Sequence, residues 1–126
     1  MSDENGQVPE AGDMRGAVVA LALDAWKLAR MLQRVLARLE EEEARRYANQ
    51  ARFLLRSLDG TLTAAGYRLV ELDGQPYDAG MAVTPLNAGD FDPGDTLFVE
   101  QMVEPVIMGP AGVVRAGTVL LAKGIR

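Results

Sequence analysis

The chain has 126 residues, a net charge of −5, and neither cysteine nor histidine. The length fits one domain, and the missing residue types exclude disulfides, thiolate chemistry, zinc fingers and histidine proton relays at neutral pH. No stretch is apolar for long enough to cross a bilayer, and the acidic N-terminus lacks the basic segment of a signal peptide. We therefore expect a soluble, cytoplasmic protein.

Three observations argue against catalysis. The two serines, Ser2 and Ser57, have no histidine to activate them. The glycines of the second half stand in β-turn contexts, and no phosphate loop or calcium loop appears. The carboxylates Asp90, Asp92 and Asp95 cluster around a Pro-Gly turn, and turn chemistry already accounts for them. We expect a protein that binds partners and is not an enzyme, with no cofactor and no metal site.

Charge divides the chain into three parts. Residues 1–13 carry four acids and no base, residues 14–65 carry nine bases against six acids, and residues 66–126 carry four bases against eight acids. The first part is polar and is interpreted as a disordered acidic tail. A basic helical segment and an acidic head follow it. A head of this size buries only a modest core, so we expect help from self-association.

Residues 14–65 are predicted to form one long amphipathic helix. They contain no proline, their only glycines are Gly16 and Gly60, and alanine, leucine, arginine and glutamate dominate. Asp13 is a suitable N-cap, and Gly66 is a suitable first residue beyond the C-terminus of the helix. At about 1.5 Å per residue this helix would be roughly 78 Å long, a length typical of coiled coils.

An apolar seam along this helix predicts a homodimer. At about 100° per residue the apolar side chains fall on one broad face, and several are eleven residues apart, which favours a nearly straight pair of helices. The run Glu40–Glu43 interrupts the face and marks the place where the seam would loosen or kink. The predicted dimer interface consists of Leu21, Leu28, Leu32, Leu36, Leu39, Tyr47, Leu54 and Leu58.

The opposite face of the helix is basic. One interpretation is a solvated face supported by pairs such as Glu41–Arg45. The other is a contact surface for an acidic partner or for the phosphates of a nucleic acid. The acidic head and the absence of interleaved aromatic residues make nucleic acid the less favoured partner. The stripe comprises Lys27, Arg34, Arg38, Arg45, Arg52 and Arg56, with Arg30 at its margin.

Residues 66–126 are predicted to form a small antiparallel sheet or open barrel, which makes the chain an α+β protein. Four β-leaning runs are separated by turn signals such as Asp73-Gly74. The segment Gly109–Gly112 is a hairpin candidate between the two longest strands, and Pro85 and Pro105 should lie at edges or bulges. The predicted strands are residues 67–72, 81–86, 96–103 and 113–122.

The join between helix and head resembles that of GrpE proteins, the nucleotide exchange factors of DnaK-type chaperones. A helix ends at Gly66, a short strand Tyr67-Arg-Leu-Val70 follows, and the turn Gly74-Gln-Pro-Tyr-Asp78 comes next. The later segments Asp95-Thr-Leu-Phe-Val99 and Val113-Val-Arg-Ala-Gly-Thr-Val119 are similar to the ending of the family. The resemblance covers roughly residues 50–124, and its motifs occur in the same order as in the family.

The resemblance implies a steric and allosteric function for the β-domain. It would dock on one lobe of the chaperone ATPase domain and favour the open cleft, from which ADP leaves faster. Arg115 matches a family arginine, and Tyr77 and Asp78 match the family turn, so these residues are predicted partner contacts. The alternatives are core packing for Tyr77 and backbone capping for Asp78. Glu100 and Gln101 are further candidates, which a solvated strand face explains equally well.

Three functions follow from these observations. The first is a GrpE-like homodimeric co-chaperone that accelerates ADP release from a DnaK-type chaperone ATPase. The second is a non-enzymatic homodimeric assembly adaptor that uses the same scaffold for a partner other than a chaperone. The third, least favoured, is a nucleic-acid binder that uses the basic helix face.

Overall fold

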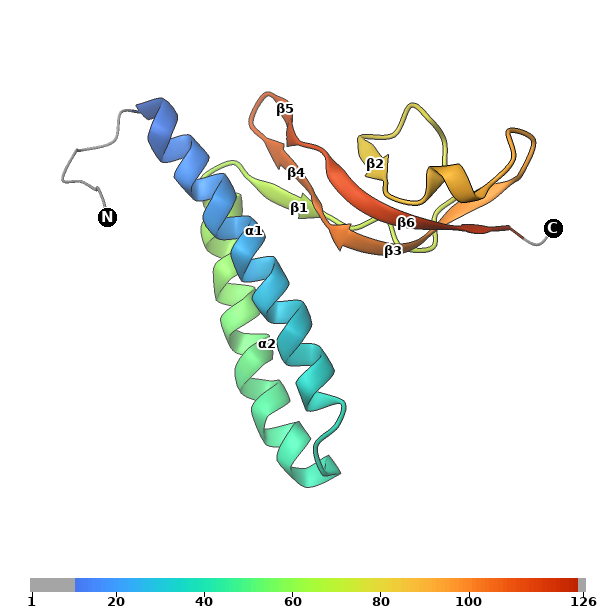
Figure 1. Cartoon of the computed structure of the whole chain (residues 1–126). Helices are drawn as coiled ribbons and strands as arrows, with labels where there is room; N and C mark the ends of the chain where they lie inside the picture. Colours follow the sequence, from blue (N-terminus) through green and yellow to red (C-terminus); the bar gives the residue numbers. More distant parts are fainter. Residues whose placement is uncertain (1–10, 125–126) are drawn as a thin grey trace, which may run out of the picture.

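The computed structural model describes residues 11–124 and contains a helical hairpin that leads into a head of short strands. Helix α1 and helix α2 lie side by side and run in opposite directions, and the turn between them is the part farthest from the head (Figure 1). The chain is therefore of mixed α+β class, as predicted. The elements are α1 Ala11–Leu36, α2 Glu41–Ala64, β1 Arg68–Val70, β2 Val83–Pro85, the short 3₁₀ helix η1 Ala88–Asp90, β3 Leu97–Glu104, β4 Val106–Gly109, β5 Gly112–Arg115 and β6 Gly117–Lys123.

The prediction of one continuous helix over residues 14–65 is wrong. The last turn of α1 tightens as the amides of Arg38 and Leu39 donate to carbonyls three residues back, and Glu40 then takes an extended conformation with φ −59° and ψ 149°. No proline or glycine is needed here, because the reversal lets both helices bury their inner sides. Glu41–Glu43 occupy the first turn of α2, where the helix dipole favours acids.

The start of α1 also differs from expectation. The helix begins at Ala11, so Asp13 lies inside its first turn instead of serving as the N-cap. The helix therefore includes residues 11–13, the last three residues of the predicted tail. The rest of the predicted tail, residues 1–10, lies outside the described residues.

The end of α2 confirms the prediction for Gly66. Its φ of +89° is a left-handed conformation that favours glycine. The amide of Gly66 donates to the Thr63 carbonyl at 2.9 Å, and the amide of Tyr67 donates to the Leu62 carbonyl at 2.8 Å. This is the Schellman pattern, and Leu62 and Tyr67 pack in the same apolar cluster. The chain therefore leaves the helix in a fixed direction, straight into β1.

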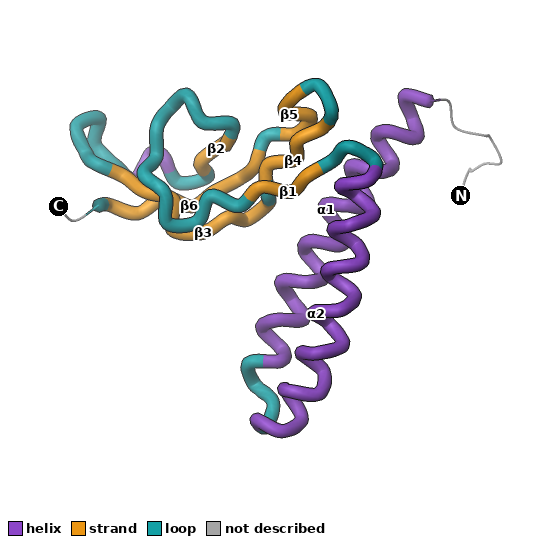
Figure 2. Tube along the Cα trace, turned by 180° about the vertical axis from the view of Figure 1, so that it is seen from behind, coloured by secondary structure: helices purple, strands orange, loops and turns teal. Residues whose placement is uncertain are grey.

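The head contains two three-stranded sheets instead of the small antiparallel sheet or open barrel that was predicted. One has the order β1-β4-β5 and is antiparallel, whereas the other has the order β2-β6-β3 with β2 parallel to β6. Figure 2 shows the strands grouped on one side of the hairpin. Buried Pro105 separates β3 from β4, so the chain changes sheet at that point.

Three strand details differ from the prediction and one agrees. The strand β4 was not predicted, and the run 113–122 is divided into β5 and β6 at Ala116. The hairpin at Gly109–Gly112 exists, but it joins β4 to β5 and not the two longest strands. Pro85 lies in the edge strand β2, as expected for a residue without an amide donor.

The core lies where α1, the two sheets and the end of α2 meet. One cluster gathers Trp26 of α1 with residues of β3, β4 and β6, namely Val99, Met102, Val106, Val119 and Leu121. A second cluster joins both helices to the first sheet through Ala22, Leu23, Leu62, Tyr67 and Ile107. The hairpin and the head thus share buried residues. Within the described residues, neither helix is long and apolar enough to span a membrane.

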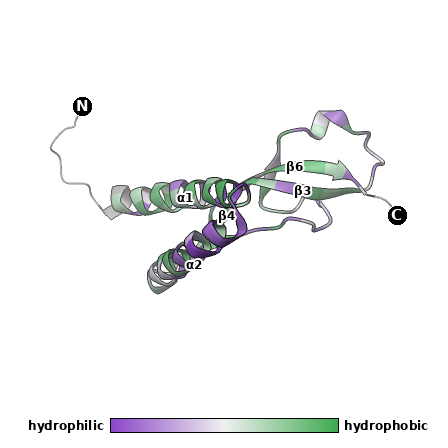
Figure 3. Cartoon of the chain, turned by 90° about the horizontal axis from the view of Figure 1, so that it is seen from below, coloured by the Kyte–Doolittle hydropathy of each residue, from purple (hydrophilic) through white to green (hydrophobic). Residues whose placement is uncertain are grey.

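Much of the hairpin's apolar surface remains exposed. Figure 3 shows hydrophobic colour distributed along α1. Leu28 is two residues from Trp26, which places it about 160° away around the helix, so its side of α1 points away from the head. The large exposed apolar side chains of the hairpin are Met14, Leu21, Leu28, Met31, Leu32, Val35, Tyr47, Phe53 and Leu54.

Candidate partner-binding surface

Trp26 is the main apolar contact between α1 and the head. Its side chain is only 7% exposed and packs in the cluster that spans both sheets. Its indole Nε1 donates a hydrogen bond of 2.7 Å to Glu71 Oε2, just beyond β1. The guanidinium of Arg30, one turn further along α1, lies over the ring at 4.6 Å from its centroid. These contacts fix the angle at which α1 crosses the head.

Arg30 extends this junction into a polar network. Its Nη2 donates to the Met102 carbonyl at 3.2 Å, and its guanidinium lies 3.6 Å from Glu71 and 3.6 Å from Asp73. Asp73 Oδ2 in turn accepts the Met102 amide at 3.1 Å. The pairing of β3 shifts register on both sides of Met102. Arg30 and Asp73 therefore provide hydrogen-bond partners for the carbonyl and the amide of Met102, between the two register shifts.

Glu104 joins three elements through one carboxylate. Its Oε2 lies 2.9 Å from Lys27 Nζ of α1, and its Oε1 accepts a hydrogen bond of 2.8 Å from Arg115 Nη2 of β5. The Glu104 side chain is 18% exposed. The hydrogen bonds from Lys27 and then Arg115 lower the pKa of Glu104, and their positive charges act in the same direction against the opposing effect of burial.

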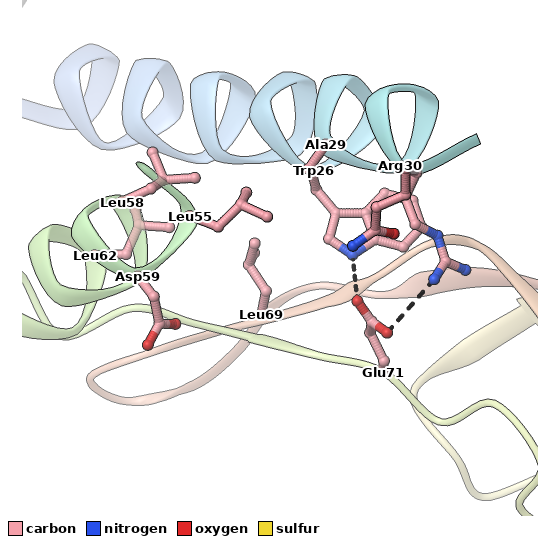
Figure 4. A pocket seen from close by; sticks show the side chains of 10 residues that line it. Trp26, Ala29, Arg30, Leu55, Leu58, Asp59, Leu62, Leu69 and Glu71 are labelled. Atoms are coloured by element: carbon pink, nitrogen blue, oxygen red, sulfur yellow. Dashed lines mark hydrogen bonds and ion pairs between the residues drawn. The ribbon is translucent and has the colours of Figure 1, made fainter. Parts of the chain in front are cut away.

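Two hollows border this junction. The first, a cleft of about 200 Å³ between the helices and β1, is shown in Figure 4. Leucines form much of its wall, and the Glu71 side chain points towards Trp26 and Arg30. The second is a groove of about 240 Å³ between α1 and β3. It is lined by Trp26, Lys27, Arg30, Arg34, Gln101, Met102 and Val103.

The structure places the predicted partner contacts at separate points of the head. Arg115 ends β5 with a side chain 43% exposed, and Gln101 borders the groove beside α1. Tyr77 lies at the other end of β3, where its amide donates to the Leu97 carbonyl and its ring packs on the core. Asp78 is exposed, and its Oδ1 accepts the Gly80 amide at 2.8 Å.

Contacts within the chain thus match the alternatives given for Tyr77 and Asp78. Glu100 and Gln101 are both exposed in the middle of β3, where the strand shifts register. Of the five candidates, only Arg115 and Gln101 lie beside side chains of the junction with α1.

The predicted dimer seam is divided between two antiparallel helices. Leu21, Leu28 and Leu54 are 69%, 62% and 64% exposed, and Leu32 and Tyr47 are exposed as well. Leu36 and Leu39 are half-buried near the turn. Leu58 packs inside the chain against the second core cluster. Most of the predicted seam is therefore available to a second molecule, but not as one continuous helix.

Sequence reasoning missed the residues that hold α1 on the head. Trp26, Glu71, Asp73 and Glu104 were not singled out, and Lys27 and Arg30 were assigned to a solvated or partner-binding stripe. The charge asymmetry between helix and head was the available signal, since basic side chains of α1 meet carboxylates of the head.

The described residues contain no group of three or more side chains that could hold a metal ion. No protein-family model matches the chain, and no curated protein or solved structure matches it significantly.

Proposed function

We propose that the chain is a GrpE-like co-chaperone that accelerates ADP release from a DnaK-type chaperone ATPase. The observation that carries the proposal is the junction from helix to head. The helix stops at a left-handed Gly66, a short strand follows, and the turn at Gly74 comes next, in the order that resembles the family. The head beyond this junction exposes Arg115, the residue that matches the family arginine.

Arg115 is suited to recognise a carboxylate of a partner. A guanidinium has five N–H donors in a rigid fork, and Glu104 accepts one hydrogen bond from it at 2.8 Å. The remaining donors stay available on a side chain that is 43% exposed. Glu104 therefore orients the Arg115 guanidinium and leaves its other N–H donors free. Lys27 Nζ in turn lies 2.9 Å from Glu104 Oε2 and holds this carboxylate in place.

The proposed mechanism needs only unequal binding to two states of the ATPase domain. A rigid head that binds the open cleft more tightly than the closed cleft shifts the population towards the open state. ADP makes fewer contacts in the open state and dissociates faster. Trp26 and Arg30 contribute by holding the hairpin and the head at one angle before docking. Binding then carries no entropic cost for ordering the hairpin relative to the head.

The test is the rate of labelled ADP release from the DnaK-type ATPase of the same cell. The full chain should accelerate release, and Arg115→Ala should reduce the acceleration by about tenfold, the loss expected for one well-placed charged contact. Arg68→Ala is the matched control, because Arg68 is exposed on β1 at the opposite edge of the same sheet. Equal losses in both variants, or no acceleration by the unmodified chain, would contradict the proposal.

The exposed seam of the hairpin supports the proposed homodimer. Leu21 and Leu28 lie two turns apart on the side of α1 that points away from the head, and large apolar groups in such a row favour burial against a second copy. The double variant Leu21→Lys with Leu28→Lys should convert a dimer to a monomer in light scattering. Leu86→Lys, an equally exposed leucine in the head, should leave the dimer intact. A monomeric unmodified chain would contradict this part.

The same exposed seam is the observation that favours the second function, an assembly adaptor with a partner other than a chaperone. It requires the dimer and the docking surface but no ATPase. Normal dimerisation together with no effect on any co-resident chaperone ATPase would favour this alternative.

A further inference from the structure

We propose that the groove between α1 and β3 is a separate docking surface for an acidic segment of a partner protein. The groove is lined by Arg34 and Gln101 and not by Arg115, so its occupation would be a function distinct from nucleotide exchange. Three features support the proposal: the spacing of three cations, the carboxylates that already neutralise two of them, and the side chains that face them.

The cations of the groove form a row along one side of α1. Lys27, Arg30 and Arg34 are separated by three and four residues, the spacing that places side chains on the same side of a helix. The row is about 10 Å long at about 1.5 Å per residue. The opposite wall is the segment 101–103 of β3, and the volume between them is about 240 Å³. An extended or helical segment with two or three acids has the matching length.

Carboxylates of the head neutralise the cations at one end of the row but not the cation at the other end. Glu104 holds Lys27, and Glu71 and Asp73 hold Arg30. Arg34, one turn further along α1, forms no ion pair with any side chain in the range 14–124, and it is exposed. An incoming carboxylate would therefore bind first at Arg34.

Gln101 gives the open end a second polar group. Its side chain is exposed on β3 and borders the same groove as Arg34. A side-chain amide has two N–H donors, so Arg34 and Gln101 can hold one carboxylate from both walls. Half-buried Val103 supplies apolar surface next to this polar pair, and the buried residues Trp26 and Met102 lie beneath it in the lining of the groove. This combination of a few cations, an amide and apolar surface suits an acidic peptide segment.

The surrounding acids disfavour nucleic acid as the occupant. A duplex presents one negative charge for about each 1.7 Å of its axis, so a phosphate backbone would extend past the short cationic row. Three carboxylates flank that row, Glu71, Asp73 and Glu104, and they would repel the additional phosphates. Side-chain carboxylates can be spaced to meet Arg34 and avoid these acids.

Trp26 provides a direct readout of this groove. It is the single tryptophan of the chain, and its ring lines the groove beneath Arg30. The experiment titrates the full chain with a short poly-glutamate peptide at physiological ionic strength while Trp26 fluorescence is recorded. A poly-glutamine peptide of the same length and a short duplex DNA oligonucleotide are titrated in parallel. We expect poly-glutamate alone to bind with a saturable change in emission.

Variants locate the binding on the chain. Arg34→Glu should weaken poly-glutamate binding by at least about tenfold, and Gln101→Ala by about threefold, the effect of one hydrogen bond. Arg56→Glu makes the same charge change on exposed α2, at a residue that does not line the groove, and should alter binding by less than about twofold because exposed charges are screened by salt. Arg115→Ala leaves Arg34 and Gln101 in place and keeps Glu104 paired with Lys27, so it should alter binding by less than about twofold, which separates this surface from the proposed exchange function.

Four results would overturn the proposal. They are an absence of binding, an unchanged Trp26 emission at saturation, equal weakening by Arg34→Glu and Arg56→Glu, and tighter binding of the oligonucleotide than of poly-glutamate. The first two would remove the site from the groove. Equal weakening would reduce the effect to net charge, and the last would assign the cations to phosphate.

Discussion

Replacing Trp26 with alanine tests whether the hairpin and the head form one folded unit. The indole is the largest side chain that α1 contributes to the core shared by both sheets, and it is 7% exposed. Truncating a buried tryptophan or phenylalanine to alanine costs about 3–5 kcal/mol through lost burial and the remaining cavity. The hydrogen bond to Glu71 adds little beyond this range, because the Glu71 carboxylate is about half exposed and regains water. We expect a loss of about 4 kcal/mol in the free energy of unfolding.

Trp26→Phe separates packing from hydrogen bonding. Phenylalanine keeps a ring beneath the Arg30 guanidinium but lacks the Nε1–H that donates to Glu71 at 2.7 Å. The smaller ring also leaves a small void, so we expect a loss of about 1–2 kcal/mol. Phe53→Ala is the control, because Phe53 is an exposed aromatic residue of α2, and its loss should cost no more than about 0.5 kcal/mol.

Urea denaturation followed by far-ultraviolet circular dichroism measures these losses. All proteins are compared at the same concentration, because a dimer makes the apparent stability depend on concentration. The unmodified chain should unfold in one transition, since the two core clusters connect both helices to both sheets. A loss below about 1 kcal/mol for Trp26→Ala, or helix and sheet signals that unfold separately, would refute the inferred packing.

Three further predictions concern stability. Because Lys27 and Arg115 lower the pKa of folded Glu104, its carboxylate stabilises the fold above the unfolded-state value of about 4.3, and this contribution is lost as the pH falls through the lower folded-state value. The melting temperature of the unmodified chain should therefore exceed that of Glu104→Gln at neutral pH and converge with it in strong acid; a constant difference would contradict this. Gly66→Ala should destabilise the fold by at least about 1 kcal/mol, because φ is +89° and a Cβ would lie 2.8 Å from Pro110 Cγ. Gly60→Ala, inside α2 with no neighbour within 4 Å, should stabilise it by up to about 1 kcal/mol. Melting temperatures that shift in the same direction for both variants would contradict this prediction. Gly117→Ala should lower the melting temperature, since its Cβ would lie 2.9 Å from the Glu104 carbonyl oxygen, and an unchanged melting temperature would show that the strands there can separate.

The parts of the fold that could be predicted from the sequence are those set by local chemistry. Gly66 ends a helix because it takes a left-handed conformation at little steric cost, and Gly109–Gly112 forms a hairpin for related reasons. The α+β class follows from the change in hydrophobic period after Gly66. Each of these features depends on residues close together in the chain.

The parts that could not be predicted depend on contacts between distant segments. Residues 37–40 contain no helix breaker, and local propensity favours a continuous helix by only small amounts. The reversal is stabilised by contacts such as Leu23 with Leu62 in the second cluster, which connect residues far apart in sequence. Strand β4 was missed for a related reason, because Pro105 reads as the end of a β segment although pairing with β1 restarts it immediately afterwards.

The candidate site shows the same division. Arg115 was found because it matches a family motif in the sequence, whereas its partner Glu104 is eleven residues away and became visible only through the fold. Tyr77 and Asp78 match the motif equally well, yet their contacts are with their own chain. The resemblance to the family therefore identified candidate positions in the sequence. Only the structure shows which of these side chains still have hydrogen-bond donors free for a partner and which already make contacts within the chain.

The charge asymmetry of the chain has an intramolecular cause that the sequence alone could not reveal. A basic stripe on a long helix suggests either solvent or an acidic partner, but here the first acidic partner of α1 is the head of the same chain. Glu104 and the carboxylates of Glu71 and Asp73 occupy Lys27 and Arg30. Lys27 and Arg30 could bind an external partner fully only by breaking their ion pairs with the head. An external acidic segment would therefore bind most favourably at Arg34, where the row of cations extends past these carboxylates. Recognition on this face and the angle between hairpin and head are therefore coupled through the same side chains.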